Sequence, residues 1–316
     1  MPLFCDPFFF TRISTIWHSA PKTSSKIDLK KGEPNIEVIS DYIDEALLTL
    51  SKNDKLYKSF VEIRNDIRKI IVNIFISNEH INLENHIKFI KALKTITNNN
   101  QNVWIFTTNY DLLFEAAACL TKTRLENCFV GAHPSFFAAD SIKLMRGTTK
   151  KNVFSPQKEL TLNLLKLHGS INWWKNKDIT ICDNSITNIS EVKERVMILP
   201  RKMKIRETLE NPFDEIFRVS HSILGDMCKY LVSCGFSFGD EHINTSLLIP
   251  KLREGSIRLT ALMKEKLPST EAFDEFPSFN YITSERAQIF KEIKNEFTDI
   301  WKFSEFVNFL ASHTGN

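Results

Sequence analysis

Hydrophobic positions spaced three and four residues apart dominate the chain between residues 36 and 100. This spacing predicts three amphipathic helices, over residues 36–50, 60–74 and 83–96, with charged side chains on their outer faces. A run of three asparagines, 98–100, ends the third helix, because asparagine favours turns and helix ends. We therefore expect an irregular segment over residues 1–35, rich in proline, serine and lysine, followed by a helical layer over residues 36–100.

From residue 103 onward the pattern changes to short, unbroken hydrophobic runs. Such runs predict strands buried on both faces, and they occur at residues 103–106, 196–199 and 230–232. Further strands are predicted at residues 162–167 and 257–259, where polar residues interrupt the hydrophobic ones. Helical spacing lies between and after them, at residues 112–120, 211–223 and 284–310. Short buried strands that alternate with helices indicate an α/β fold, a Rossmann-like parallel sheet flanked by helices. The expected organisation is thus the helical layer as an insert, and a Rossmann-type domain over residues 101–316 that ends in a helical tail.

Composition excludes several classes of protein. The 41 basic and 38 acidic residues give a net charge of +3, which does not support nucleic acid as a partner. No apolar stretch reaches the roughly 18 residues of a membrane span, so no membrane association is expected. The six cysteines form no C-x-x-C pair, which argues against a zinc ribbon or a secreted disulfide framework. A cytoplasmic protein with reduced thiols and no metal is expected.

Polar residues follow three of the predicted strands directly, at residues 107–111, 168–174 and 235–244. In an open parallel sheet, ligands bind where the carboxyl ends of the strands converge. Polar groups that directly follow buried strands lower the stability of the fold unless they are hydrogen-bonded. A cluster of them therefore suggests that a ligand supplies hydrogen-bond partners. These three segments are therefore the candidate site.

The same segments resemble one protein family. Phe106-Thr-Thr-Asn-Tyr-Asp-Leu-Leu-Phe-Glu115, Lys166-Leu-His-Gly-Ser-Ile-Asn-Trp173 and Gly235-Phe-Ser-Phe-Gly-Asp-Glu-His-Ile-Asn244 are together similar to the sirtuin-like (silent information regulator) family. They resemble in particular the bacterial antiphage-defence branch, whose members hydrolyse NAD to nicotinamide and ADP-ribose. The resemblance covers approximately residues 36–257.

This resemblance implies roles for individual residues. Asn109 and His168 match the catalytic positions. An amide can hold a water and a ribose hydroxyl without adding charge, and histidine accepts a proton near neutral pH. The resemblance also implies that NAD, as substrate, contacts Thr107, Thr108, Asp111, Gly169, Ser170, Gly235, Phe236, Ser237, Asp240 and His242.

Two features depart from the family pattern. Family members open with a strand and a Gly-Ala-Gly turn that holds the pyrophosphate, whereas Gly32 is the only glycine before Gly131 in this chain. We therefore expect that the family's first strand and its glycine loop are missing. The four-cysteine zinc module of protein-deacylating sirtuins is also absent from the sequence, which makes NAD-dependent deacylation the weakest of the functional hypotheses.

Alternative interpretations remain open for the whole chain and for its site. Without the glycine loop the chain is alternatively a catalytically impaired nucleotide-binding or scaffold subunit. It would then assemble with itself or with a partner ATPase, as the resemblance suggests. Asn109 and Asp111 are equally explained as caps of the helix near Leu112, and Asp240 and His242 as caps near Ile243. His168 alone would be interpreted as a buried histidine bonded to backbone.

Overall fold

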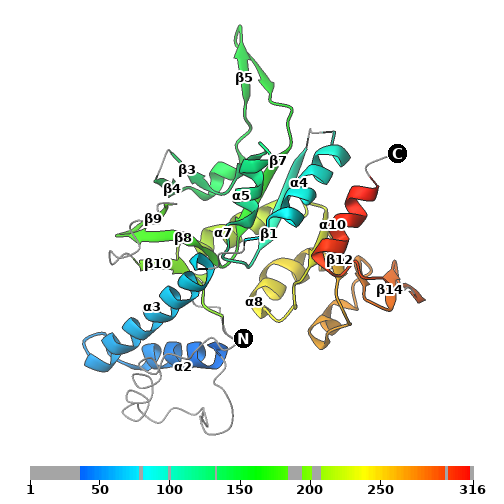
Figure 1. The fold of residues 1–316 in the computed structure, drawn as a ribbon. Coiled ribbons are helices and arrows are strands. Elements are labelled where there is room, and N and C mark those ends of the chain that lie inside the picture. Colours follow the sequence, from blue (N-terminus) through cyan, green and yellow to red (C-terminus); the bar gives the residue numbers. More distant parts are fainter. Residues whose placement is uncertain are drawn as a thin grey trace. The chain divides into compact units, whose positions relative to one another are not determined.

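The computed structural model describes residues 36–77, 81–98, 101–131, 134–183, 194–200, 208–295 and 298–313 (Figure 1). These residues form two compact units. The first contains the described residues up to 77 together with 198–200, and the second contains all the others. The segment 1–35, predicted to be irregular, lies outside the described residues.

The first unit is built on two helices, α2 (Ile36–Thr49) and α3 (Lys55–Ile76), which confirm the first two predicted helices. Asp54 caps α3, because its Oδ1 accepts a hydrogen bond from the Leu56 N–H at 2.8 Å. The apolar stripes of the two helices form one core around Ile43, Phe60 and Ile67. Ile67 is fully buried, as helical spacing of its neighbours predicts.

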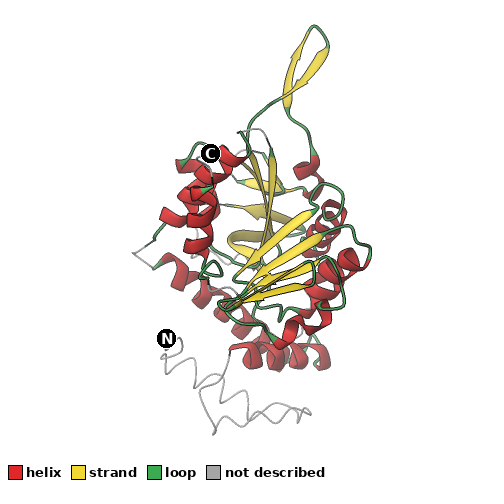
Figure 2. Cartoon of the chain, turned by 90° about the vertical axis from the view of Figure 1, so that its right-hand side faces the viewer, coloured by secondary structure: helices red, strands yellow, loops and turns green. Residues whose placement is uncertain are grey.

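The second unit contains the parallel strands that the sequence predicts. β7 lies between two neighbours in the order β1-β7-β2, and both pairings are parallel. The strands are β1 (Asn102–Thr107), β2 (Arg124–Glu126) and β7 (Thr161–Lys166). One face of this sheet is apolar and packs against α4 (Glu84–Ile96) and α5 (Leu113–Leu120). The C-terminal helix α10 (Phe303–Ser312) packs against α4, and Figure 2 shows helices flanking the strands of this unit.

A second sheet of the same unit has the order β11-β12-β13-β14-β15. Its first three strands are parallel: β11 (Tyr230–Cys234), β12 (Arg258–Leu262) and β13 (Phe279–Ile282). The helices that precede or follow β11 are α7 (Phe213–Ile223), α8 (Glu241–Ile243), the π-helix η3 (Asn244–Leu248) and α9 (Ile249–Arg253). The 3₁₀ helix η4 (Pro268–Phe273) precedes β13. Parallel strands with flanking helices confirm the predicted Rossmann-like α/β fold.

The prediction of a helix over residues 284–310 is wrong for the first half of this range. The structure has the antiparallel strands β14 (Arg286–Ile289) and β15 (Glu292–Asn295) there, and only α10 is helical. Phe290 and Lys291 make the tight turn with φ of 51° and 68°, which no helix accommodates. Phe290 and Ile293, which a helix would place on one stripe, are 58% and 61% exposed.

The sequence analysis also did not predict an antiparallel sheet, whose strand order is β10-β8-β9-β4-β3. Residues after His168, expected as a loop, form the strand β8 (Gly169–Asn176), which pairs with β9 (Ile179–Cys182) and with β10 (Glu194–Met197). The short strands β3 (Phe129–Val130) and β4 (Ser135–Phe137) complete it, followed by the 3₁₀ helix η1 (Ala139–Lys143). A separate hairpin, β5 (Gly147–Lys150) and β6 (Val153–Pro156), extends away from these sheets (Figure 1).

Two of the parallel strands are edge strands within the described residues. β1 pairs there only with β7, and β11 pairs only with β12. On β11 this leaves Tyr230 75% exposed and Val232 49% exposed, although a central strand of a parallel sheet is normally covered on both faces. Among the described helices, none combines the length and the hydropathy needed to cross a membrane.

Candidate functional site

The segment that follows β1 forms a hydrogen-bonded turn. The Thr107 Oγ1 accepts a hydrogen bond from the Asn109 N–H at 3.1 Å, and Asn109 is exposed beyond this turn. Asp111 Oδ1 accepts from the Leu113 N–H at 3.0 Å, so this carboxylate holds the first turn of α5. Asp111 therefore binds a backbone N–H at the start of α5, although the N-cap residue is Leu112, which has no side-chain capping bond. Asn109 does not cap this helix through a bond that involves its own side chain, and it is exposed.

The register of β1 and β7 brings Asn109 and His168 to the same edge. Thr107 pairs with Lys166 at the last rung, so Asn109 and His168 each lie two residues beyond it. The two segments are also tied to each other, since the Tyr110 carbonyl accepts the Ile171 N–H at 3.1 Å and the Ser170 hydroxyl at 3.2 Å. The predicted catalytic residues thus come from segments that are hydrogen-bonded together.

A buried lysine reinforces this junction, and the sequence analysis missed it. The Lys166 side chain is 3% exposed, and its Nζ lies 2.8 Å from Glu115 Oε1 and 3.0 Å from Ser170 Oγ. It also donates to the Asp111 carbonyl. Three acceptors therefore surround the ammonium, which is how a buried charge is normally accommodated. The available signal was a lysine in an otherwise apolar buried strand, Leu164-Leu165-Lys166-Leu167.

An imidazole–carboxylate pair joins the second and third segments. His168 Nε2 lies 2.9 Å from Asp240 Oδ2, with the two side chains 5% and 7% exposed. The other oxygen, Asp240 Oδ1, accepts the Ile243 N–H at 3.3 Å and so caps α8. Asp240 was expected to contact NAD, but its carboxylate faces His168 and the helix. Asp240 thereby links the segments that follow the strands β7 and β11.

Other residues of the third segment contact one another. The Phe236 ring lies 4.8 Å from that of Phe238, and the Ser237 carbonyl accepts the Ser269 hydroxyl at 2.7 Å. The Ser237 hydroxyl accepts the Gly239 N–H at 3.3 Å. His242 packs 4.4 Å from the Phe217 ring and its Nδ1 lies 3.2 Å from Ser246 Oγ. Burial, with His168 contributing, lowers the pKa of His242 below its ordinary value, although Asp240 opposes this shift.

A family model described as SIR2-like domain matches residues 103–273, which is more than half of the chain and contains all three segments. The chain belongs to the SIR2-like domain family. Members of this family use NAD. No curated protein matches the chain.

Within the SIR2-like domain, Gly169 and Ser170 are buried rather than open to a ligand. Gly169 has φ of +83°, and a Cβ at this position would lie 2.4 Å from the Val196 carbonyl oxygen. Glycine is therefore required where β8 passes β10. By contrast, Gly235 has φ of +71° and open space around the position of a Cβ. Of the two glycines expected to contact NAD, only Gly235 leaves room for a ligand.

The cysteines of the SIR2-like domain form no disulfide with one another. Burial raises the pKa of Cys128 to about 12 and that of Cys182 to about 11, so both stay protonated thiols at neutral pH. Among the described residues, no three side chains of histidine, cysteine, aspartate or glutamate lie close enough together to hold a metal ion.

Proposed function

We propose that the chain hydrolyses NAD to nicotinamide and ADP-ribose, with Asn109 and His168 as its catalytic residues. The observation that supports this most directly is the buried His168–Asp240 pair at the polar end of the parallel strands. A carboxylate that orients an imidazole is a common arrangement for proton transfer. Membership of a family that uses NAD supports the substrate class.

The proposed reaction assigns a separate task to each residue. The bond between the nicotinamide nitrogen and ribose C1′ breaks with its electron pair moving to the ring nitrogen, and positive charge develops on the ribose. A water oxygen bonds to C1′ and releases a proton. Because the Nε2–H of His168 is donated to Asp240, Nδ1 is the basic nitrogen that accepts this proton. Asn109 hydrogen-bonds the water and a ribose hydroxyl through a neutral amide.

A fluorescent NAD analogue incubated with the purified full chain tests this assignment. Turnover is expected for the wild type and a loss of at least about 100-fold for His168→Ala and for Asn109→Ala. His221→Ala, which removes an exposed histidine on α7, is the matched control and should retain activity. Equal turnover by the wild type and His168→Ala would contradict the proposal.

A second candidate is a binding or scaffold subunit without turnover. The third segment favours it, because the Ser237 and Asp240 groups expected to contact NAD already have partners within the protein. Calorimetry with NAD and with ADP-ribose separates the two candidates. Micromolar binding of either ligand together with measurable hydrolysis excludes the inactive subunit, whereas binding without hydrolysis supports it.

The similarity of the three motifs to the defence branch supports a biological setting for this activity. We infer that the chain depletes cytoplasmic NAD as part of a bacterial antiphage defence system, assembling with itself or with a partner ATPase. Phage plaques on bacteria that carry the wild type should be fewer than on bacteria that carry His168→Ala. Equal plaque numbers, with both proteins expressed, would contradict a defence role that depends on hydrolysis.

A further inference from the structure

The β1-β7-β2 sheet has two chemically different faces. One carries Leu162 and its apolar neighbours under α4 and α5. Residues on the other face alternate with these, and the strand register places them in two rows across the sheet. The rows are Asn102, Thr161 and Arg124, then Trp104, Asn163 and Glu126. Six hydrogen-bonding residues on one face of a short parallel sheet are unusual, because such faces are normally apolar and covered.

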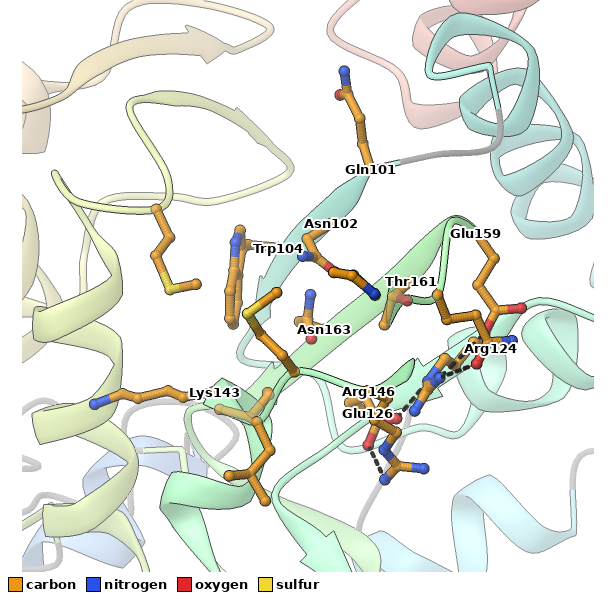
Figure 3. Close-up of a pocket in the computed structure, with 16 residues that line it drawn as sticks. Gln101, Asn102, Trp104, Arg124, Glu126, Lys143, Arg146, Glu159, Thr161 and Asn163 are labelled. Atoms are coloured by element: carbon orange, nitrogen blue, oxygen red, sulfur yellow. Dashed lines mark hydrogen bonds and ion pairs between the residues drawn. The ribbon is translucent and has the colours of Figure 1, made fainter. Parts of the chain in front are cut away.

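These rows form the floor of a cavity of about 220 Å³, which we call the amide pocket (Figure 3). The residues on either side of the β5–β6 hairpin, 142–146 and 156–157, line it as well, together with Met227. Asn102 and Thr161 are the first residues of their strands, whereas Asn109 and His168 follow the last rung. The amide pocket therefore lies at the opposite end of the strands from the proposed catalytic residues.

Each charged residue of the amide pocket has an ion-pair partner. Arg124 lies 2.8 Å from Glu126 and 3.2 Å from Glu159, and Arg146 lies 3.0 Å from Glu126. Figure 3 shows these pairs along one side of the cavity. Lys143, the remaining charged residue of the lining, lies 3.4 Å from Asp140 outside the cavity. Each cation therefore has a carboxylate beside it, so neither a phosphate nor a cation is favoured. A neutral ligand suits this electrostatic environment.

One polar group in the amide pocket lacks a partner. Asn163 is 3% exposed, and within the described part of the chain its Nδ2 has no hydrogen-bond acceptor. Figure 3 shows this amide between Trp104 and Thr161. A buried donor without an acceptor is unfavourable, and such groups in native proteins call for an explanation. A ligand that presents an acceptor in the cavity would satisfy it.

Trp104 supplies an aromatic surface beside this donor. The indole is half-buried and lines the cavity, and among the described side chains no ring or cation stacks on it. Met145 and Met227 add polarisable side chains to the same lining. A flat ring with acceptor atoms in its plane fits an indole, two methionines and an amide donor together.

We propose that the amide pocket is a second binding site, which takes a neutral nucleobase presented by a nucleoside. The base stacks on Trp104, and a ring nitrogen or carbonyl of the base accepts a hydrogen bond from Asn163 Nδ2. The site is separate from the one that would hydrolyse NAD, so it does not depend on the proposed activity.

Calorimetric titration of the purified full chain with adenosine tests this site. Adenosine bound in the proposed catalytic crevice would not be affected by changes at Asn163 and Trp104, because these lie toward the opposite end of the strands. One adenosine is expected to bind per chain, and both Asn163→Leu and Trp104→Ala should weaken this binding about 10-fold or more. Asn176→Leu, which replaces an exposed asparagine of β8, is the matched control and should bind adenosine as the wild type does.

The unfolding temperature of Asn163→Leu separates a loss of binding from a loss of folding. Leucine resembles asparagine in size and needs no acceptor, so Asn163→Leu should unfold at the same temperature as the wild type or higher. A weakened binding therefore cannot be attributed to misfolding. Absence of binding up to millimolar adenosine, unchanged binding by Asn163→Leu, or ribose binding as tightly as adenosine would overturn the proposal. If Asn109→Ala abolishes adenosine binding and Asn163→Leu does not, adenosine binds in the proposed catalytic crevice, and only the amide-pocket proposal is overturned.

Discussion

His168 Nε2 and Asp240 Oδ2 lie 2.9 Å apart. His168 follows the strand β7, which ends at Lys166, and Asp240 follows the strand β11, which begins 64 residues later at Tyr230. Because Asp240 also accepts the Ile243 N–H, its carboxylate is held in place by the helix that it caps. This fixes which ring nitrogen of His168 carries the proton in the neutral state. The pair therefore places the proton of neutral His168 on Nε2, as the proposed role of Nδ1 as a base requires.

Asp240→Asn should lower NAD hydrolysis strongly without unfolding the protein. The asparagine oxygen can still accept from Ile243, which places its NH₂ group against Nε2 and makes Nδ1 carry the proton instead. A fall in kcat of about 100-fold or more with little change in KM is expected. Asp54→Asn changes a helix cap in the first unit in the same way and should leave kcat unchanged. Equal kcat values for the two variants would exclude the orienting role of Asp240.

Lys166→Met should destabilise the second unit by about 3 kcal/mol, measured as the free energy of unfolding in urea. The variant leaves Ser170 and the Asp111 carbonyl without their donor, and Glu115 without its cation. Adding Glu115→Gln should recover part of the loss, since the uncompensated carboxylate is then removed. Lys158→Met, at an exposed position, should change stability by less than about 0.5 kcal/mol. A similar effect at both lysines would contradict the structural role of Lys166.

Gly169→Ala and Gly235→Ala form a matched pair of substitutions. Both positions have a left-handed backbone, so each alanine should cost about 1 kcal/mol for that reason alone. Only at Gly169 does the new methyl group approach the Val196 carbonyl, to 2.4 Å, and this should add about 2 kcal/mol. Thermal unfolding of both variants measures the difference. Equal melting temperatures would show that β8 and β10 can separate at Gly169.

His86 should make the protein less stable in mild acid. Its ring packs against Phe114 at 4.9 Å and Phe303 at 5.2 Å, and burial lowers its pKa, opposed by Asp111. Because the folded pKa is lower than that of the unfolded chain, the unfolded state binds more protons below about pH 6.5, and stability falls as the pH decreases. His86→Phe should therefore lose less stability than the wild type between pH 8 and pH 5 in urea unfolding. His221→Phe, at an exposed position, should show the wild-type pH dependence.

Sequence patterns predicted the parallel strands because buried strands have a local signature. Val103 to Phe106 is an unbroken apolar run and Leu162 to Leu167 is mostly leucine, and they match the strands β1 and β7. The polar residues behind them fall at one edge because parallel strands in register end together. That the first two site segments lie side by side was therefore predictable, and hydrogen bonds at Tyr110 confirm it.

The remaining features depend on contacts that no local pattern encodes. Gly169 begins a strand only because β10, more than twenty residues later, pairs with it. Residues 286–295 have helical spacing, yet the turn at Phe290 and Lys291 makes them a hairpin. The partners of Lys166 and Asp240 come from distant segments, so their roles emerge only from the folded chain.

The β5–β6 hairpin has every residue exposed, from Gly147 to Lys150 and from Val153 to Pro156. Its tip, Lys151 and Asn152, contributes nothing to any hydrophobic core, since both side chains face water. A fluorophore or an epitope inserted between these two residues would therefore leave both the three polar segments and the folded scaffold intact. The tip offers a convenient attachment point for immobilising or imaging the protein.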